Sequence, residues 1–94
     1  MHQAILMQGV EAWNIWVNKN DGVIPILIKA DLNGVDLKGA NLNQADLNQA
    51  HLKGANLKGA DLRESHLRGA DLRVAKLTRA DLRGAKLRRT DLRG

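Results

Sequence analysis

Leucine recurs at every fifth residue over most of this chain. From Ala30 to Gly94 the sequence divides into thirteen consecutive five-residue units, which cover 65 of the 94 residues. Each unit has leucine at its centre, a small residue two positions before it, and Asp, Asn, His or Lys directly before it. The central leucines are Leu32, Leu37, Leu42, Leu47, Leu52, Leu57, Leu62, Leu67, Leu72, Leu77, Leu82, Leu87 and Leu92. Such a repeat predicts stacked units that bury their apolar sides against their neighbours.

A period of five fits neither of the two regular secondary structures. On an α-helix five residues advance by about 500°, so successive leucines would spiral around the axis. On a flat strand an odd spacing would place them on alternate faces. If each unit instead turns the chain by a quarter circle, every leucine points inward and four units form a coil of twenty residues, stacked about 4.8 Å from the next. We expect an all-β solenoid of about three coils with a square cross-section, with Leu32 to Leu87 in its core.

The tandem pattern A(D/N)LXX resembles that of the pentapeptide-repeat family. The resemblance covers residues 30–94, and the segment GVEAWNIWVNKND before Pro25 is similar to the N-terminal segment of small cyanobacterial members. The resemblance implies a right-handed, four-sided parallel β-helix. The quarter-turn argument gives the square shape, whereas the handedness comes only from the resemblance.

Residues 1–24 have a different pattern, which predicts an N-terminal capping helix and linker before the β-helix of residues 25–94. Between Gln3 and Asn18 an apolar stripe follows the spacing of one helical face. Its members are Leu6, Val10, Trp13, Trp16 and Val17. A solenoid leaves the apolar end of its first coil open, and terminal caps usually cover it. We expect this helix to cover the open end of the first coil, with both tryptophans packed against it. The alternative roles for the two tryptophans are stacking on a ligand and anchoring at a membrane surface.

The net charge of +5 lies entirely in residues 60–94, which hold ten bases and five acids. One interpretation is a solvated surface, in which Asp61, Asp71, Asp81 and Asp91 pair with the arginine two residues later. The other is a polyanion-binding end, with nucleic acid as the partner. Its contacts would be Arg63, Arg68, Arg73, Arg83, Arg88 and Arg93. The bases are expected on all four sides, and the basic half has no aromatic residue, which argues against specific readout of nucleic acid.

The C-terminal end of the repeat has no apparent cap. Leu87, Thr90 and Leu92 are expected at an apolar edge with unpaired backbone groups, which is prone to pairing with another chain. A homodimer related by a two-fold axis would cover this edge. The alternatives are a frayed last coil and a chain that belongs to a longer repeat protein.

Catalytic, cofactor and metal sites are not expected. The absence of cysteine excludes thiolate chemistry, and His51 and His66 fall on different sides of the square, so they cannot share a metal ion. The acids lie on a convex surface with no pocket to shift their pKa values. The N-terminus lacks the pattern of a signal peptide and no segment could span a membrane, so we expect a cytoplasmic protein. The sequence favours a non-enzymatic scaffold or interaction module with an unknown protein partner; the alternative is a weak, salt-dependent polyanion binder.

Overall fold

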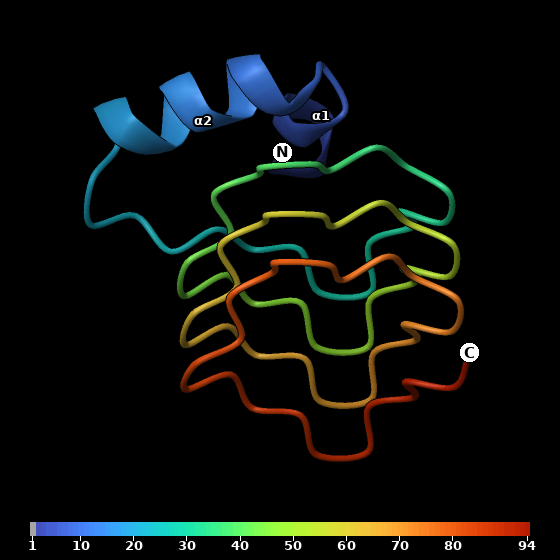
Figure 1. Cartoon of the computed structure of the whole chain (residues 1–94). Coiled ribbons are helices and arrows are strands. Elements are labelled where there is room, and N and C mark those ends of the chain that lie inside the picture. The colour runs from blue at the N-terminus through green and yellow to red at the C-terminus, as the bar shows by residue number, and fades with distance from the viewer. Residues whose placement is uncertain (1) are drawn as a thin grey trace.

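Two short helices lie across one end of a stack of square coils (Figure 1). The computed structural model describes residues 2–94. Helix α1 spans His2–Leu6 and helix α2 spans Val10–Lys19. The coils are held together by parallel bridges between residues twenty apart. The bridged pairs are Ile26–Asp46, Asp31–His51, Asp36–Asn56, Asn41–Asp61, Asp46–His66, His51–Asp71, Asn56–Lys76, Asp61–Asp81, His66–Lys86 and Asp71–Asp91.

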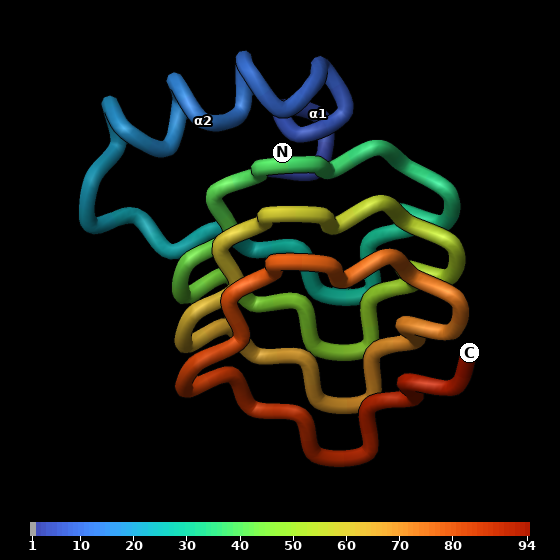
Figure 2. The backbone as a smooth tube through the Cα atoms, in the orientation of Figure 1, coloured from blue at the N-terminus to red at the C-terminus, as the bar shows by residue number. Residues whose placement is uncertain are grey.

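Each five-residue unit forms one side of a coil. On a typical side the N–H of Leu32 donates to the carbonyl of His51 at 2.7 Å, and the N–H of His51 donates to the carbonyl of Ala30 at 2.8 Å. The side ends in a turn, in which the N–H of Val35 donates to the carbonyl of Leu32 at 3.2 Å. The same bonds recur with a period of five along the chain and of twenty between coils, which produces the square tube of Figure 2.

The residue before each corner has a positive φ. Glycine occupies this position in many units, but Val74 adopts a φ of 51° there. A β-branched residue is a clear outlier in this region because its Cβ crowds the backbone.

We expect Val74→Gly to raise the free energy of unfolding by about 1 kcal/mol, because relief of this strain exceeds the entropy that glycine gains in the unfolded chain. The matched reverse change is Gly59→Val, at a φ of 66° with no atom within 4 Å of the added Cβ. It should lower the free energy by about 1–2 kcal/mol. Urea unfolding of both variants measures the difference. Effects of equal sign would show that backbone strain is not the cause.

The core is a column of leucine and alanine inside the tube. The leucines from Leu27 to Leu72 are buried, and alanines at the small position fill the space between them. The expected core extends to Leu87, but Leu77, Leu82 and Leu87 are only partly buried and Leu92 is 47% exposed. Among the residues that the structure describes, none stack on the far side of residues 75–94, so these leucines contact a neighbouring coil on one side only.

The prediction of one continuous helix from Gln3 to Asn18 is wrong. The chain forms two helices, and Gly9, the last of the three residues between them, has a φ of 114°, which is incompatible with a helix. The apolar spacing continues across this break, so that Leu6 of α1 and Trp13 of α2 are both buried in the core. The spacing therefore identified the buried side chains but did not reveal the change of direction between the helices.

Candidate functional site

Side chains from the two helices bind the edge of the first coil. Trp13 is fully buried, and its Nε1 donates to the carbonyl of Asn41 at 2.8 Å. The N–H of Asn41 donates to Oδ1 of Asn14 at 2.7 Å. On another side the N–H of Ile26 donates to Nδ1 of His2 at 2.7 Å. Deeper in the stack, the residue at this position bonds to the coil above it through the same two backbone groups. These side chains therefore bond to backbone groups that, deeper in the stack, bond to the coil above.

The other residues of the N-terminal apolar stripe pack around Trp13 and the core. Trp16 stacks on Trp13 with their ring centroids 5.3 Å apart, and its other neighbour is the His2 ring at 5.0 Å. Val10, Trp16 and Val17 are partly buried against the core. Trp13 has no exposed surface on which a ligand could stack.

Two opposite sides of the tube carry paired charges. We call them the Asp–Arg faces: the first is formed by residues 30–34, 50–54, 70–74 and 90–94, and the second by residues 40–44, 60–64 and 80–84. In each late unit the aspartate before leucine binds the arginine after it. The four pairs are Asp61–Arg63 at 2.8 Å, Asp71–Arg73 at 2.7 Å, Asp81–Arg83 at 2.6 Å and Asp91–Arg93 at 2.7 Å. The sequence spacing predicted these pairs.

The pairing is two-pronged and reaches between coils. The Arg83 guanidinium donates through Nε and Nη2 to the two oxygens of Asp81, while the Arg83 backbone N–H donates to Oδ1 of Asp81. Arg63 also lies 3.9 Å from Asp81 in the next coil. Two-pronged contacts of this kind fix the orientation of both side chains. On each Asp–Arg face the opposite charges are therefore held in fixed positions, both within one coil and between coils.

These contacts lower the pKa values of the aspartates, which corrects the expectation that a convex surface would leave them unshifted. The side-chain hydrogen bond from Arg83 is the main cause that lowers the pKa of Asp81 from 3.8 to about 2. The side-chain bond from Arg73 lowers the pKa of Asp71 further. A pocket is not needed, because a guanidinium two residues away on the same side supplies the shift.

The lowered pKa values predict a loss of stability in acid. A carboxyl group whose pKa is lower in the folded chain stabilises the fold above its unfolded pKa, and this contribution is lost as the pH falls through the folded pKa. For Asp81 that range runs from 3.8 down to about 2. We expect the carboxyl group of Asp81 to titrate near pH 2, followed by the NMR shift of its carboxyl carbon. In Arg83→Gln the midpoint should move upward, because the largest cause of the lowered pKa, the side-chain hydrogen bond, is lost. An unchanged midpoint in that variant would rule out the pairing as the cause.

The other two sides of the tube hold the net positive charge. The first cationic face comprises residues 35–39, 55–59 and 75–79, and the second comprises residues 45–49, 65–69 and 85–89. The bases of the first are Lys38, Lys58, Lys76 and Arg79, against Asp36; those of the second are Arg68, Lys86, Arg88 and Arg89, against Asp46. Bases thus lie on all four sides, as expected, but the net positive charge is confined to two of them. Four of the six arginines assigned to a polyanion lie in Asp–Arg pairs, whereas Arg68 and Arg88 form no ion pair within residues 2–94.

A shallow hollow lies on the first cationic face. It has a volume of about 340 Å³ and is lined by Lys38, Lys58, Gly59, Thr78 and Arg79. Three of these five residues are bases and none is acidic, and Thr78 adds a hydroxyl group. Lys38, Lys58 and Thr78 follow one another at a spacing of twenty residues, which is the length of one coil.

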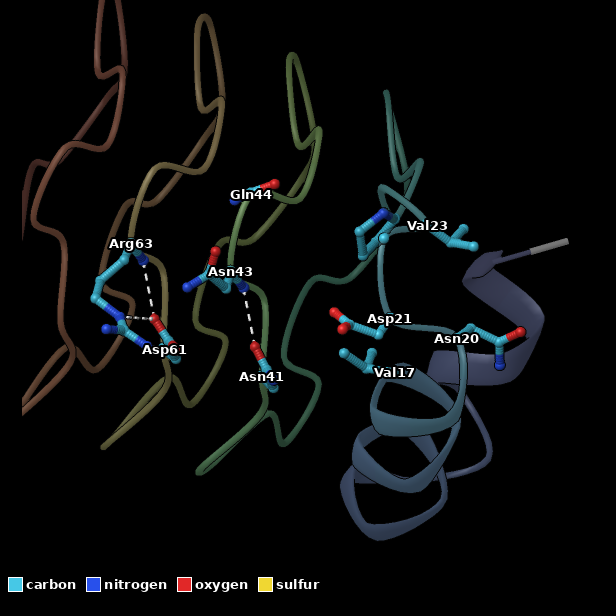
Figure 3. Close-up of a pocket in the computed structure, with 11 residues that line it drawn as sticks. Val17, Asn20, Asp21, Val23, Asn41, Asn43, Gln44, Asp61 and Arg63 are labelled. Carbon is cyan, nitrogen blue, oxygen red and sulfur yellow. Dashed lines mark hydrogen bonds and ion pairs between the residues drawn. The ribbon is translucent and has the colours of Figure 1, made fainter.

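A second hollow lies between the linker after α2 and the second Asp–Arg face (Figure 3). Its volume is about 410 Å³, and its lining residues are Val17, Asn20, Asp21, Gly22, Val23, Pro25, Asn41, Asn43, Gln44, Asp61 and Arg63. In Figure 3 the Asp61–Arg63 pair and the bond from the Asn43 N–H to Asn41 Oδ1 lie along its wall. The hollow is polar, and its charged pair is already satisfied internally.

The remaining candidate residues are scattered or lie at the open end. His51 is on the first Asp–Arg face and His66 on the second cationic face, and residues 2–94 contain no group of three His, Asp or Glu side chains placed to hold a metal ion. Thr90 donates through Oγ1 to the carbonyl of Leu67 at 2.6 Å. Within the same described range, neither helix is long and apolar enough to cross a membrane.

The repeat is similar to that of known proteins, both in sequence and among solved structures. The family profile described as "Pentapeptide repeats (8 copies)" matches residues 30–69 and 55–94. No curated protein matches the chain. A similar solved structure is the pentapeptide repeat protein Rfr23 from the cyanobacterium Cyanothece 51142, with 37% identity over 71% of this chain and a TM-score of 0.41. This chain spans 43% of that protein's length.

Two further solved structures are cyanobacterial as well. A pentapeptide repeat protein from Nostoc Pcc 7120 is 30% identical, with 85% of this chain and 84% of its own length covered and a TM-score of 0.33. HetL, from the same Nostoc strain and involved in heterocyst differentiation regulation, is 30% identical over 66% of this chain and 44% of its own, with a TM-score of 0.33. The profile match covers all thirteen units with the central leucine in register, and on that basis the chain belongs to the pentapeptide repeat family.

Proposed function

We propose that this protein is a non-enzymatic scaffold or protein-interaction module. In this proposal it is a right-handed β-helix of about three coils, closed at one end by α1 and α2, whose outer faces bind another protein. The observation that carries the proposal is the sorting of charge. Backbone bonds between coils hold the outward side chains in register, and two opposite faces are neutralised while the other two present unpaired bases. A rigid surface with ordered charge favours selective contact with a complementary acidic surface.

Photo-crosslinking tests this role. A photoreactive amino acid is placed at Thr78 on the first cationic face, or at Asn43 on the second Asp–Arg face, in cells that produce the protein. We expect discrete crosslinked proteins from position 78 and few from position 43, because only the former adjoins unpaired bases. Equal crosslinking at both positions, or none at either, would contradict an interaction role for the cationic faces.

The hollow on the first cationic face supports a second candidate function, polyanion binding. Lys38, Lys58 and Arg79 converge there, with no acid in the lining. Successive coils place bases at a spacing of about 4.8 Å along this face. Several bases in a row on one side attract a polyanion chiefly by releasing its counterions, and such binding depends strongly on salt.

Matched variants test the polyanion candidate with a 20-base-pair DNA duplex as the probe. Lys58→Gln with Arg79→Gln removes two charges from the cationic hollow, and Arg63→Gln with Arg83→Gln removes two from an Asp–Arg face. We expect the first pair to weaken binding about tenfold and to reduce the salt slope by about 2, and the second to have a smaller effect. Equal losses would mean that only net charge matters, and no binding by the parent at low salt would rule this candidate out.

We also propose a homodimer, because the last coil, residues 75–94, has partly exposed leucines. Leu87, Thr90 and Leu92 lie at this end of the tube, and their apolar surface would be covered by a second copy. Light scattering over a range of protein concentrations measures whether the dimer forms.

A further inference from the structure

Exposed apolar side chains lie close together at the start of the tube. In the described part of the chain eight large apolar side chains are exposed, and four of them are Val23, Ile24, Ile26 and Ile28. Ile26 and Ile28 flank the buried Leu27 on the outside of the tube, with exposed fractions of 50% and 47%. In the thirteen units that follow, the positions directly before and after leucine are polar. The coil therefore does not require isoleucine at either position.

These isoleucines extend the second cationic face by one coil. Ile26 bridges to Asp46, and two further bridges of the same ladder lead to Lys86. The N–H of Lys29 donates to the carbonyl of Asn48 at 3.0 Å, so residues 25–29 stack on residues 45–49. We call residues 25–29 together with the second cationic face the apolar–basic face. Its bases are Lys29, Arg68, Lys86, Arg88 and Arg89, and its acid is Asp46.

The combination of apolar and basic side chains distinguishes this face from the other three. Within residues 2–94 none of its five bases forms an ion pair. The first cationic face has four bases against Asp36, but none of its residues, all of which the structure describes, is an exposed large apolar one. On the Asp–Arg faces the late arginines are paired. Exposed apolar residues that lie together and adjoin charged ones are typical of an interaction surface.

A lipid bilayer with anionic headgroups is complementary to both parts of this face. Its headgroups attract bases on a protein surface, and each base near the surface strengthens the binding. Apolar side chains strengthen it further when they enter the boundary between headgroups and acyl chains. A nucleic acid binds bases through its phosphates, which would leave Ile26 and Ile28 in water. An amphipathic peptide requires a groove for its apolar side chains, whereas these isoleucines project from one side of a tube.

The spacing of the coils fits one orientation on the bilayer. At about 4.8 Å per coil, Ile26 lies about 14 Å from Lys86 along the face. Amphipathic helices at a membrane surface bury their apolar side about 5–10 Å into the boundary of headgroups and acyl chains. With a small tilt of the tube, the isoleucines enter this boundary while Arg68 and Arg88 extend their long side chains to the headgroup phosphates.

We propose that the apolar–basic face binds the surface of a lipid bilayer that contains anionic headgroups, with Ile26 and Ile28 at the boundary of the acyl chains and the bases of later coils at the headgroups. This inference goes beyond the proposed function. The opposite side of the tube, the first cationic face, stays accessible to a protein partner. The photo-crosslinking test at Thr78 concerns that opposite face, so the two proposals can fail separately.

Co-sedimentation with lipid vesicles tests this binding. One set of vesicles contains equal parts of phosphatidylglycerol and phosphatidylcholine, and the other contains phosphatidylcholine alone. We expect the parent to bind the anionic vesicles at least about tenfold more tightly. Arg68→Gln with Arg88→Gln should lower the partition coefficient about tenfold, because two bases leave the headgroup layer. Ile26→Ser with Ile28→Ser should lower it about tenfold as well, because less apolar surface is buried.

Matched controls make the same changes on other surfaces. Lys53→Gln with Lys76→Gln removes two bases from the first Asp–Arg face and the first cationic face. Ile15→Ser with Val74→Ser removes two exposed apolar side chains. Each control should leave the partition coefficient within about threefold of the parent value, because charges farther from the bilayer than about 8 Å are screened at physiological salt. Circular dichroism verifies that every variant folds.

The isoleucine variant separates a bilayer from the other possible occupants of this face. Ile26→Ser with Ile28→Ser should leave binding to the DNA duplex of the polyanion test unchanged. Vesicle binding that this variant does not weaken would overturn the proposal, because net charge alone would then account for it. A parent that does not bind anionic vesicles even at low salt would overturn it too. If a photoreactive amino acid at Ile28 then gave discrete crosslinked proteins, the occupant of the face would be a protein.

Discussion

Trp13→Ala is expected to lower the free energy of unfolding by about 3–5 kcal/mol, the range for removing a large buried aromatic side chain. Trp13 has no exposed surface and stacks on Trp16. Its Nε1 is also the donor to the carbonyl of Asn41 at the edge of the first coil. The variant would lose the aromatic packing and leave that carbonyl without its partner. Chemical unfolding followed by circular dichroism measures the change.

Two further variants separate these contributions. Trp13→Phe keeps most of the apolar packing but loses the N–H donor, so it should cost less than alanine and about 1–3 kcal/mol. Ile15→Ala on the same helix is the control, since Ile15 is 50% exposed and should change stability by less than about 1 kcal/mol. If Trp13→Ala were no more destabilising than Ile15→Ala, the helices would not cover the first coil as described.

Leu52→Ala should lower the free energy of unfolding by about 2–5 kcal/mol. Leu52 is fully buried in the middle of the stack, where coils above and below prevent the space from collapsing. The same substitution at Leu92, which is 47% exposed, should cost less than about 1 kcal/mol. The repeat makes the two positions equivalent in sequence, so their difference reports only position in the stack. Equal losses of unfolding free energy, measured with urea, would contradict a core in which the burial of leucine decreases toward the last coil.

The spacing of leucine and alanine was enough to predict the coil, because a five-residue period excludes both helix and flat strand. The same regularity made it difficult to see that paired charges lie on two faces and unpaired bases on the other two. The aspartate and arginine of one unit recur ten residues later, as in Asp61–Arg63 and Asp71–Arg73, and a separation of ten residues is half a coil. Grouping residues by twenty separates the four faces and places bases on each of them, so the sorting shows only when the acids of each face are counted against its bases.

Two features depend on how the N-terminal segment is placed. Gly9 inside an apolar helical pattern was a signal of the break between α1 and α2, but the spacing of Leu6 and Trp13 spans it without interruption. The polar hollow at Asp61 and Arg63 exists because the linker after α2 returns beside that face. Such a contact between segments forty residues apart has no trace in local sequence pattern.

Paired nitroxide spin labels test whether residues twenty apart stack on one another. The chain has no native cysteine, so labels can be attached at Lys58→Cys with Thr78→Cys, twenty residues apart, or at Lys58→Cys with Arg68→Cys, ten residues apart. At about 4.8 Å between coils, the first pair should show strong spin–spin broadening. The second pair lies on opposite cationic faces and should show none. Broadening from the second pair, or equal spectra from both, would contradict the four-sided coil.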